Sequence, residues 1–224
     1  MSREHHLPVT RTARYFALGP VSGAPKELWI CCHGYGQSAA RFLRHFARID
    51  DGSRLLVAPE ALSRFYIEET NGGSHADAKV GASWMTREDR LSEIDDYIGY
   101  LDALVAQLGA DYDLAHARVI ALGFSQGVAT VARWVERGRS RVDEIILWAG
   151  ALPPDMDLDR PAHPLRSLRP LVVLGDADAY AHPDAVAEQE RRLRARGIDY
   201  ELIRFAGGHR LDYDTLAALA ARWG

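Results

Sequence analysis

The chain reads VIALGFSQG at residues 119–127, and this stretch carries its clearest structural signal. An apolar run typical of a buried strand leads into a Gly-x-Ser-x-Gly pattern centred on Ser125, and residues 128–135 then have the pattern of a helix. A serine in this setting is typical of a nucleophile elbow, a sharp turn from strand to helix. Glycine at positions 123 and 127 removes the Cβ clash that so tight a turn would create. The sequence therefore predicts that the Ser125 hydroxyl stands above a sheet edge, beside a helix N-terminus that favours negative charge.

Strands and helices alternate along the rest of the chain. Seven apolar runs predict strands at residues 14–18, 28–32, 55–58, 119–122, 145–148, 171–174 and 200–205. Several are continuous runs of Val, Ile and Leu, as expected of parallel strands that are covered on both faces. Helical patterns occupy residues 38–48, 88–108, 126–137, 184–196 and 212–223, and Gly109 is expected to end the second of them. This alternation predicts an α/β fold, with a mostly parallel twisted sheet of about seven strands and helices on both faces.

One long segment, residues 59–87, has no clear strand or helix pattern. We expect residues 1–224 to form a single domain in which 59–87 is a long loop or flap near the active site, because loops of this length are usually functional or mobile. The polar, glycine-bearing run at residues 68–75 is expected to be the mobile part. Little sequence remains for a large lid domain.

Composition and charge exclude several classes of function. The net charge of −4 makes nucleic acid an unexpected partner, and no apolar run approaches the length of a membrane span. The N-terminus lacks the apolar core of a signal peptide. The two cysteines, Cys31 and Cys32, are neighbours in a predicted strand and point to opposite faces, so we expect no disulfide between them. Together these features favour a cytoplasmic protein.

The residues that Ser125 needs as partners follow it in order. A serine hydroxyl is a weak nucleophile unless a base, usually a histidine oriented by a carboxylate, takes its proton. In α/β-hydrolases the order along the chain is serine, acid, histidine, each after a strand. The strand at 171–174 leads into Asp176 and Asp178, and the strand at 200–205 leads into His209. We assign His209 as the base and favour Asp178 as the acid, with Asp176 as its rival.

Two backbone N–H groups are expected to stabilise an oxyanion beside Ser125. One belongs to Gln126, the residue after the nucleophile, and the other to Tyr35, in the glycine-flanked turn after the strand at 28–32. His33, in the same turn, is interpreted as a structural residue that orients the loop. Aromatic and apolar side chains in the neighbouring loops are predicted to line an acyl pocket, although each could equally be a packing residue: Phe65, Tyr66, Trp84, Met85 and Tyr180.

These motifs resemble the phospholipase/carboxylesterase family, which includes the acyl-protein thioesterases and has the α/β-hydrolase fold. The resemblance rests on Gly-Phe-Ser-Gln-Gly, an upstream His-Gly-x-Gly turn, a Gly-x-x-Asp acid loop and a Gly-His near the C-terminus, and it covers the chain from about Leu28 to Asp212. It implies Ser125, Asp178 and His209 as the triad and Tyr35 and Gln126 as oxyanion donors. The chain departs from the family pattern at Val128, where a second glycine is usual, and in a longer acid loop. These departures leave the substrate open.

The sequence thus predicts a serine hydrolase that cleaves carboxylic esters of small to medium acyl chains and needs no metal or cofactor. An acyl thioesterase, a lysophospholipase or a peptidase-like acyl hydrolase are alternatives within enzymes. The alternative from another class is a non-catalytic ligand-binding protein on a hydrolase fold. A small ester or thioester is the expected partner. A homodimer is a second possibility, because exposed aromatic side chains in loops can form a dimer interface as well as line a pocket.

Overall fold

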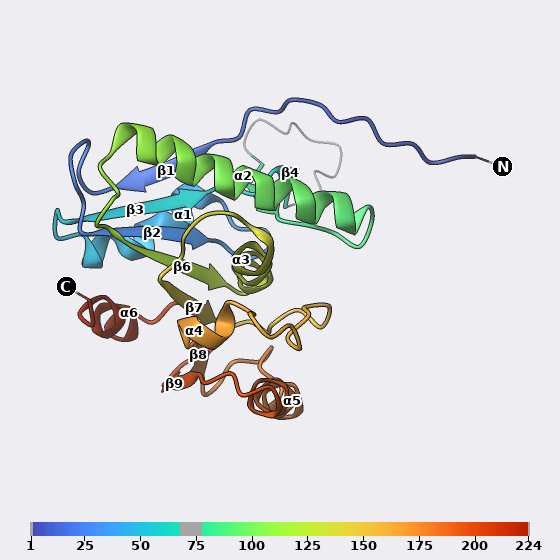
Figure 1. The fold of residues 1–224 in the computed structure, drawn as a ribbon, viewed down its shortest axis with the longest axis vertical. Helices are drawn as coiled ribbons and strands as arrows, with labels where there is room; N and C mark the ends of the chain where they lie inside the picture. Colours follow the sequence, from blue (N-terminus) through green and yellow to red (C-terminus); the bar gives the residue numbers. More distant parts are fainter. Residues whose placement is uncertain (1, 68–77, 224) are drawn as a thin grey trace.

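A seven-stranded twisted sheet forms the centre of the computed structural model, which describes residues 2–67 and 78–223 (Figure 1). The strand order is β1-β3-β2-β6-β7-β8-β9, and every pair is parallel except β1 with β3. The strands are Tyr15–Leu18 (β1), Glu27–Cys32 (β2), Arg54–Pro59 (β3), Arg118–Phe124 (β6), Glu144–Trp148 (β7), Leu171–Gly175 (β8) and Glu201–Phe205 (β9). The predicted α/β fold with a mostly parallel sheet is therefore confirmed.

Helices cover both faces of this sheet, as Figure 1 shows. They are α1 (Ala39–Leu43), the 3₁₀ helix η1 (Arg44–Ile49), α2 (Arg90–Asp111), α3 (Gln126–Arg137), α4 (Leu165–Leu168), α5 (Pro183–Ala195) and α6 (Tyr213–Ala220). Alternate residues of each strand enter different cores. In β2, Trp29 and Cys31 pack with α1, η1 and α6, whereas Ile30 and Cys32 pack with α2, α3 and α5. The two cysteine side chains therefore lie on opposite faces, and both are free.

The segment between β3 and α2 contains a hairpin that the sequence pattern did not reveal. Strands β4 (Ser63–Tyr66) and β5 (Val80–Ser83) pair antiparallel, with Ser63 opposite Ser83 and Tyr66 opposite Val80. Each strand has only four residues, which is too few for an alternating pattern to stand out. The predicted flap at 68–75 lies outside the described residues.

Several helix boundaries differ from their predictions, and α6, predicted at residues 212–223, spans only Tyr213–Ala220. Helix α2 continues through Gly109 to Asp111, because Gly109 keeps helical geometry and the Tyr112 N–H closes the helix on the Leu108 carbonyl at 2.8 Å. The helix predicted at 38–48 is divided into the short α1 and the tighter η1. Within the described ranges, no helix combines the length and the apolar character that crossing a membrane requires.

Candidate active site

Ser125 sits at a strained turn between β6 and α3. Its backbone has a positive φ of 55° with ψ −116°, a strained conformation that a non-glycine residue keeps only when its surroundings hold it. A Cβ on Gly123 would lie 2.3 Å from the Gly127 carbonyl oxygen, and a Cβ on Gly127 would lie 2.1 Å from that of Cys32. The Ser125 N–H donates to the Trp148 carbonyl of β7 at 2.9 Å. The close approach of α3 and of the end of β2 therefore explains both glycines of the motif.

His209 joins Ser125 to Asp178 by two hydrogen bonds. The Ser125 Oγ lies 3.0 Å from His209 Nε2, and His209 Nδ1 lies 2.9 Å from Asp178 Oδ2. The Asp178 side chain is 1% exposed, and its other oxygen accepts the Tyr180 N–H at 2.9 Å. The carboxylate thus favours the tautomer with the proton on Nδ1, which leaves Nε2 free to accept a proton from the serine.

Asp176, the rival acid, points elsewhere. Its side chain is exposed and faces Arg204, with 3.7 Å between the carboxylate and the guanidinium. The acid loop and the histidine loop are held together by the backbone, because the Ala177 N–H donates to the Gly207 carbonyl at 2.9 Å. Across these joined loops, Asp178 and not Asp176 forms the hydrogen bond with His209.

The turn after β2 brings the Tyr35 N–H to the same side of the sheet as Ser125. A Cβ on Gly34 would lie 3.2 Å from the Ser125 Cβ, so the two turns are in contact. The turn is closed by Gln37, whose Oε1 accepts the Gly34 N–H at 2.7 Å. Gln126 is the first residue of α3, where an N–H has no intrahelical acceptor. In residues 2–67 and 78–223, neither the Tyr35 N–H nor the Gln126 N–H donates a hydrogen bond.

The Gln126 side chain has a role that sequence reasoning missed. Its Oε1 accepts the Trp84 N–H at 3.1 Å, and its Nε2 donates to the Ser83 hydroxyl at 3.1 Å and to the Met85 carbonyl at 2.9 Å. These bonds tie α3 to the end of the β4–β5 hairpin. No signal in the sequence relates Gln126 to a segment about forty residues earlier.

Trp84 and His33 pack together under the turn after β2. Trp84 is 3% exposed, and its Nε1 donates to the His33 carbonyl at 2.8 Å. The His33 ring lies 2.8 Å from the Gly34 carbonyl through Nδ1, and its Nε2 accepts the Ala61 N–H at 3.1 Å. Burial lowers the pKa of His33, so the ring is neutral and carries its proton on Nδ1. His33 thus orients the turn, in agreement with its structural interpretation.

The other predicted pocket residues lie in three places. Tyr180 is 76% exposed, and its ring centroid lies 4.7 Å from that of His209. Phe65, in β4, packs its ring 5.2 Å from that of Tyr35. Tyr66 is half-exposed at the end of β4, and Met85 lies partly buried under Gln126. The structure therefore brings Tyr180 to the base and Phe65 to the donor turn.

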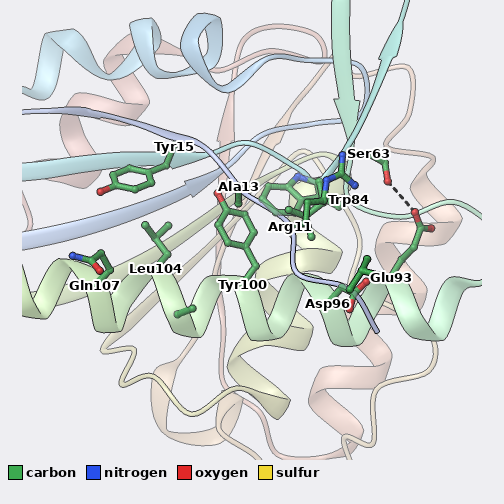
Figure 2. Close-up of a pocket in the computed structure, with 13 residues that line it drawn as sticks. Arg11, Ala13, Tyr15, Ser63, Trp84, Glu93, Asp96, Tyr100, Leu104 and Gln107 are labelled. Atoms are coloured by element: carbon green, nitrogen blue, oxygen red, sulfur yellow. Dashed lines mark hydrogen bonds between the residues drawn. The ribbon is translucent and has the colours of Figure 1, made fainter. Parts of the chain in front are cut away.

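A cavity of about 520 Å³ lies between the N-terminal segment and α2. Figure 2 shows Arg11 and Tyr15 on one side of it, Glu93 and Tyr100 of α2 on the other, and Trp84 at the back. Neither Ser125 nor His209 is among the described residues that line it. A second cavity, of about 60 Å³, is lined by Tyr180 and lies beside His209.

Comparisons with known proteins agree with this architecture. Esterase PE8 has 26% sequence identity and a TM-score of 0.66 over 95% of this chain and 98% of its own. Acyl-protein thioesterase 2 of Zea mays has 16% identity and a TM-score of 0.67 over 95% and 100%, and a carboxylesterase of Mesorhizobium loti has 20% identity and a TM-score of 0.62 over 88% of each chain. No curated protein sequence gives a significant match.

The sequence model of one family covers nearly the whole chain. It is described as phospholipase/carboxylesterase, and it matches residues 16–221, from β1 to the end of α6. This match spans the turn at Ser125, the acid loop and the histidine loop. The chain therefore belongs to the phospholipase/carboxylesterase family, a family of hydrolases with the α/β-hydrolase fold.

Proposed function

We propose that the protein is a serine hydrolase that cleaves carboxylic esters of small to medium acyl groups, with Ser125, His209 and Asp178 as its catalytic triad. The observation that carries the proposal is the continuous hydrogen-bonded line from Ser125 Oγ through the His209 ring to a buried carboxylate. The three residues come from the ends of three parallel strands, where ligands bind in open α/β sheets.

The geometry supports acyl transfer in two steps. His209 Nε2 takes the proton of Ser125 as Oγ attacks the ester carbonyl, and Asp178 stabilises the imidazolium that forms. The N–H groups of Tyr35 and Gln126 donate to the oxyanion of the tetrahedral intermediate. His209 then gives its proton to the leaving alcohol. Water, activated by the same ring, hydrolyses the acyl-enzyme and restores the serine.

Labelling with a fluorophosphonate probe tests the nucleophile directly. Intact-protein and peptide mass spectrometry should find one adduct, on Ser125, and the Ser125→Ala variant should not label. Hydrolysis of p-nitrophenyl acetate should fall by roughly 10⁴- to 10⁶-fold in that variant. Ser167→Ala, at an exposed position of α4, is the matched control and should behave as wild type. A folded wild-type protein that neither labels nor turns over would instead identify a ligand-binding protein on a hydrolase fold.

A matched pair of variants tests the acid. Asp178→Asn should lower kcat by roughly 10⁴-fold, because an amide favours the wrong histidine tautomer. Asp176→Asn, two residues away, should keep the wild-type rate. Equal effects of the two substitutions would refute the assignment of Asp178. Testing p-nitrophenyl esters against matched thioesters and lysophospholipids with the wild type then distinguishes the ester from its alternatives.

A further inference from the structure

The cavity of about 60 Å³ beside His209 has walls that touch both the nucleophile and the base. Tyr180, which lines it, holds its ring 4.7 Å from the His209 ring. Gly150, on another wall, approaches the nucleophile so closely that a Cβ there would lie 2.5 Å from the Ser125 carbonyl oxygen. The cavity is therefore separated from the nucleophile and from the base by one wall residue each, Gly150 and Tyr180.

The walls are apolar apart from one buried amide. They come from the turn after β7, the end of β8, the acid loop and α5, and the apolar members are Ala149, Gly150, Ala151, Leu174, Ala181, Ala185 and Val186. The polar group is Gln189 of α5, which is 8% exposed. The Tyr180 side chain also reaches the cavity, but it is mostly exposed to solvent.

The orientation of the Gln189 amide follows from its one hydrogen bond. The Leu152 N–H lies 2.7 Å from it and requires an acceptor, so the oxygen Oε1 faces Leu152. The Nε2 group is then the side directed away from Leu152, and it donates to no acceptor in the described part of the chain. Because this N–H has no protein acceptor in the described part of the chain and is not sealed from solvent, it favours a ligand that brings an acceptor.

We infer that this cavity binds the acyl group of the substrate, and that Gln189 makes the enzyme prefer short acyl chains that carry an ether or carbonyl oxygen. This inference rests on the proposed hydrolase function. The volume of the cavity admits roughly four to six water-sized groups, at about 10–15 Å³ for each. An alkyl chain of that length leaves the Gln189 N–H unpaired, whereas an oxygen in the chain accepts from it.

Matched p-nitrophenyl esters that differ by one oxygen for one methylene test the preference. The pairs are methoxyacetate with butanoate and 3-methoxypropanoate with pentanoate, which place the oxygen at two depths. The measured quantity is the ratio of kcat/KM for the ether to that for the alkyl ester. Dividing the wild-type ratio by the ratio in Gln189→Met cancels the intrinsic reactivity of the esters. We expect this quotient to be about 3 to 10 for at least one pair, the size of one neutral hydrogen bond.

Two further variants make the result independent of how well Gln189→Met folds. Ala185→Leu narrows the cavity from the exposed side of α5 and should lower kcat/KM for pentanoate relative to acetate by about 10-fold, as expected from steric exclusion of one or two methylenes. Glu188→Met, on the solvent side of the same helix, is the control and should leave both ratios at their wild-type values.

The possible outcomes separate this inference from the function on which it rests. A quotient near 1 for both pairs refutes the role of Gln189, and an unchanged chain-length ratio in Ala185→Leu refutes the cavity as the acyl site. In both cases, the proposed hydrolase function still stands if the wild type hydrolyses the acetate ester. If the folded wild type hydrolyses no ester and does not label at Ser125, the proposed function itself fails.

Discussion

Replacing Gln126 by methionine removes the contacts that tie the turn at Ser125 to the β4–β5 hairpin. Methionine has a similar length, but it cannot accept the Trp84 N–H or donate to Ser83 and Met85, which lie 2.9–3.1 Å from the glutamine amide. The Met85 carbonyl keeps a second donor, the Ser83 hydroxyl at 2.8 Å. The Trp84 N–H is therefore the one backbone group that the substitution leaves without its partner.

These losses set the expected change in stability. A buried N–H without an acceptor costs about 1–3 kcal/mol, and the other lost bonds contribute about 1 kcal/mol net. We expect the free energy of unfolding to fall by about 2–4 kcal/mol. In a domain of about this size, 1 kcal/mol corresponds to about 2–4 °C in Tm, so the melting temperature should fall by about 5–15 °C.

The same substitution should lower kcat more than it raises KM. The backbone N–H of Gln126 is a proposed oxyanion donor, and loss of one such donor costs roughly 10²- to 10³-fold in kcat. A displaced donor costs less than a missing one, so we expect about a 10-fold loss in kcat with KM nearly unchanged. Thermal unfolding and steady-state hydrolysis of p-nitrophenyl acetate measure the two effects.

Ser83→Ala is the matched control for this experiment. It keeps the bonds from Gln126 to Trp84 and Met85, so its Tm should fall by less than about 4 °C and its kcat by less than about twofold. The reasoning is refuted if Gln126→Met melts with the wild type and retains its kcat, because the amide contacts would then hold neither the hairpin nor the donor.

Three other perturbations test the turn, a buried carboxylate and a buried histidine. Gly127→Ala places a Cβ 2.1 Å from the Cys32 carbonyl oxygen, so circular dichroism should show a Tm lowered by more than about 10 °C, or no folded protein. Asp102→Ala removes the acceptor of four buried or half-buried donors and should lower the free energy of unfolding in urea by about 3–5 kcal/mol. Burial alone would raise the pKa of Asp102, but those hydrogen bonds outweigh it and hold the pKa below its usual range. The free energy of unfolding of the wild type should therefore decrease as the pH falls below about 4. The decrease should be smaller in Asp102→Asn, which has no carboxylate to protonate at this position. Burial lowers the pKa of His33, so the unfolded chain binds its proton more readily and stability should decline as the pH falls below about 6.5, with a flatter profile in His33→Gln.

The features that follow from local sequence agree well with the structure. All seven predicted strands of the central sheet are present. Apolar runs mark the five inner strands, which are buried on both faces, whereas β1 and β9 lie at the sheet edges and are partly exposed. The sequence also predicts the turn at Ser125, because its two glycines mark positions where a side chain would clash. At Gly123 the clash is within the strand–turn–helix unit, and at Gly127 it is with the end of the neighbouring strand β2. The sequence pattern does not predict β4 and β5. Each strand has only four residues, too few for a clear alternation, and their pairing joins segments more than ten residues apart.

The sequence by itself determined the alternation of strands and helices, the position of Ser125 at a sharp turn, and the order in which an acid and a histidine follow it. Each of these depends on residues that are close along the chain. The tertiary structure alone decided that Asp178 rather than Asp176 faces His209, that the Gln126 side chain holds the hairpin, and that a small cavity with the Gln189 amide lies beside the base. These depend on distances between segments that are remote in sequence, and such distances exist only once the strands take their order in the sheet and the loops at their carboxyl ends pack against one another.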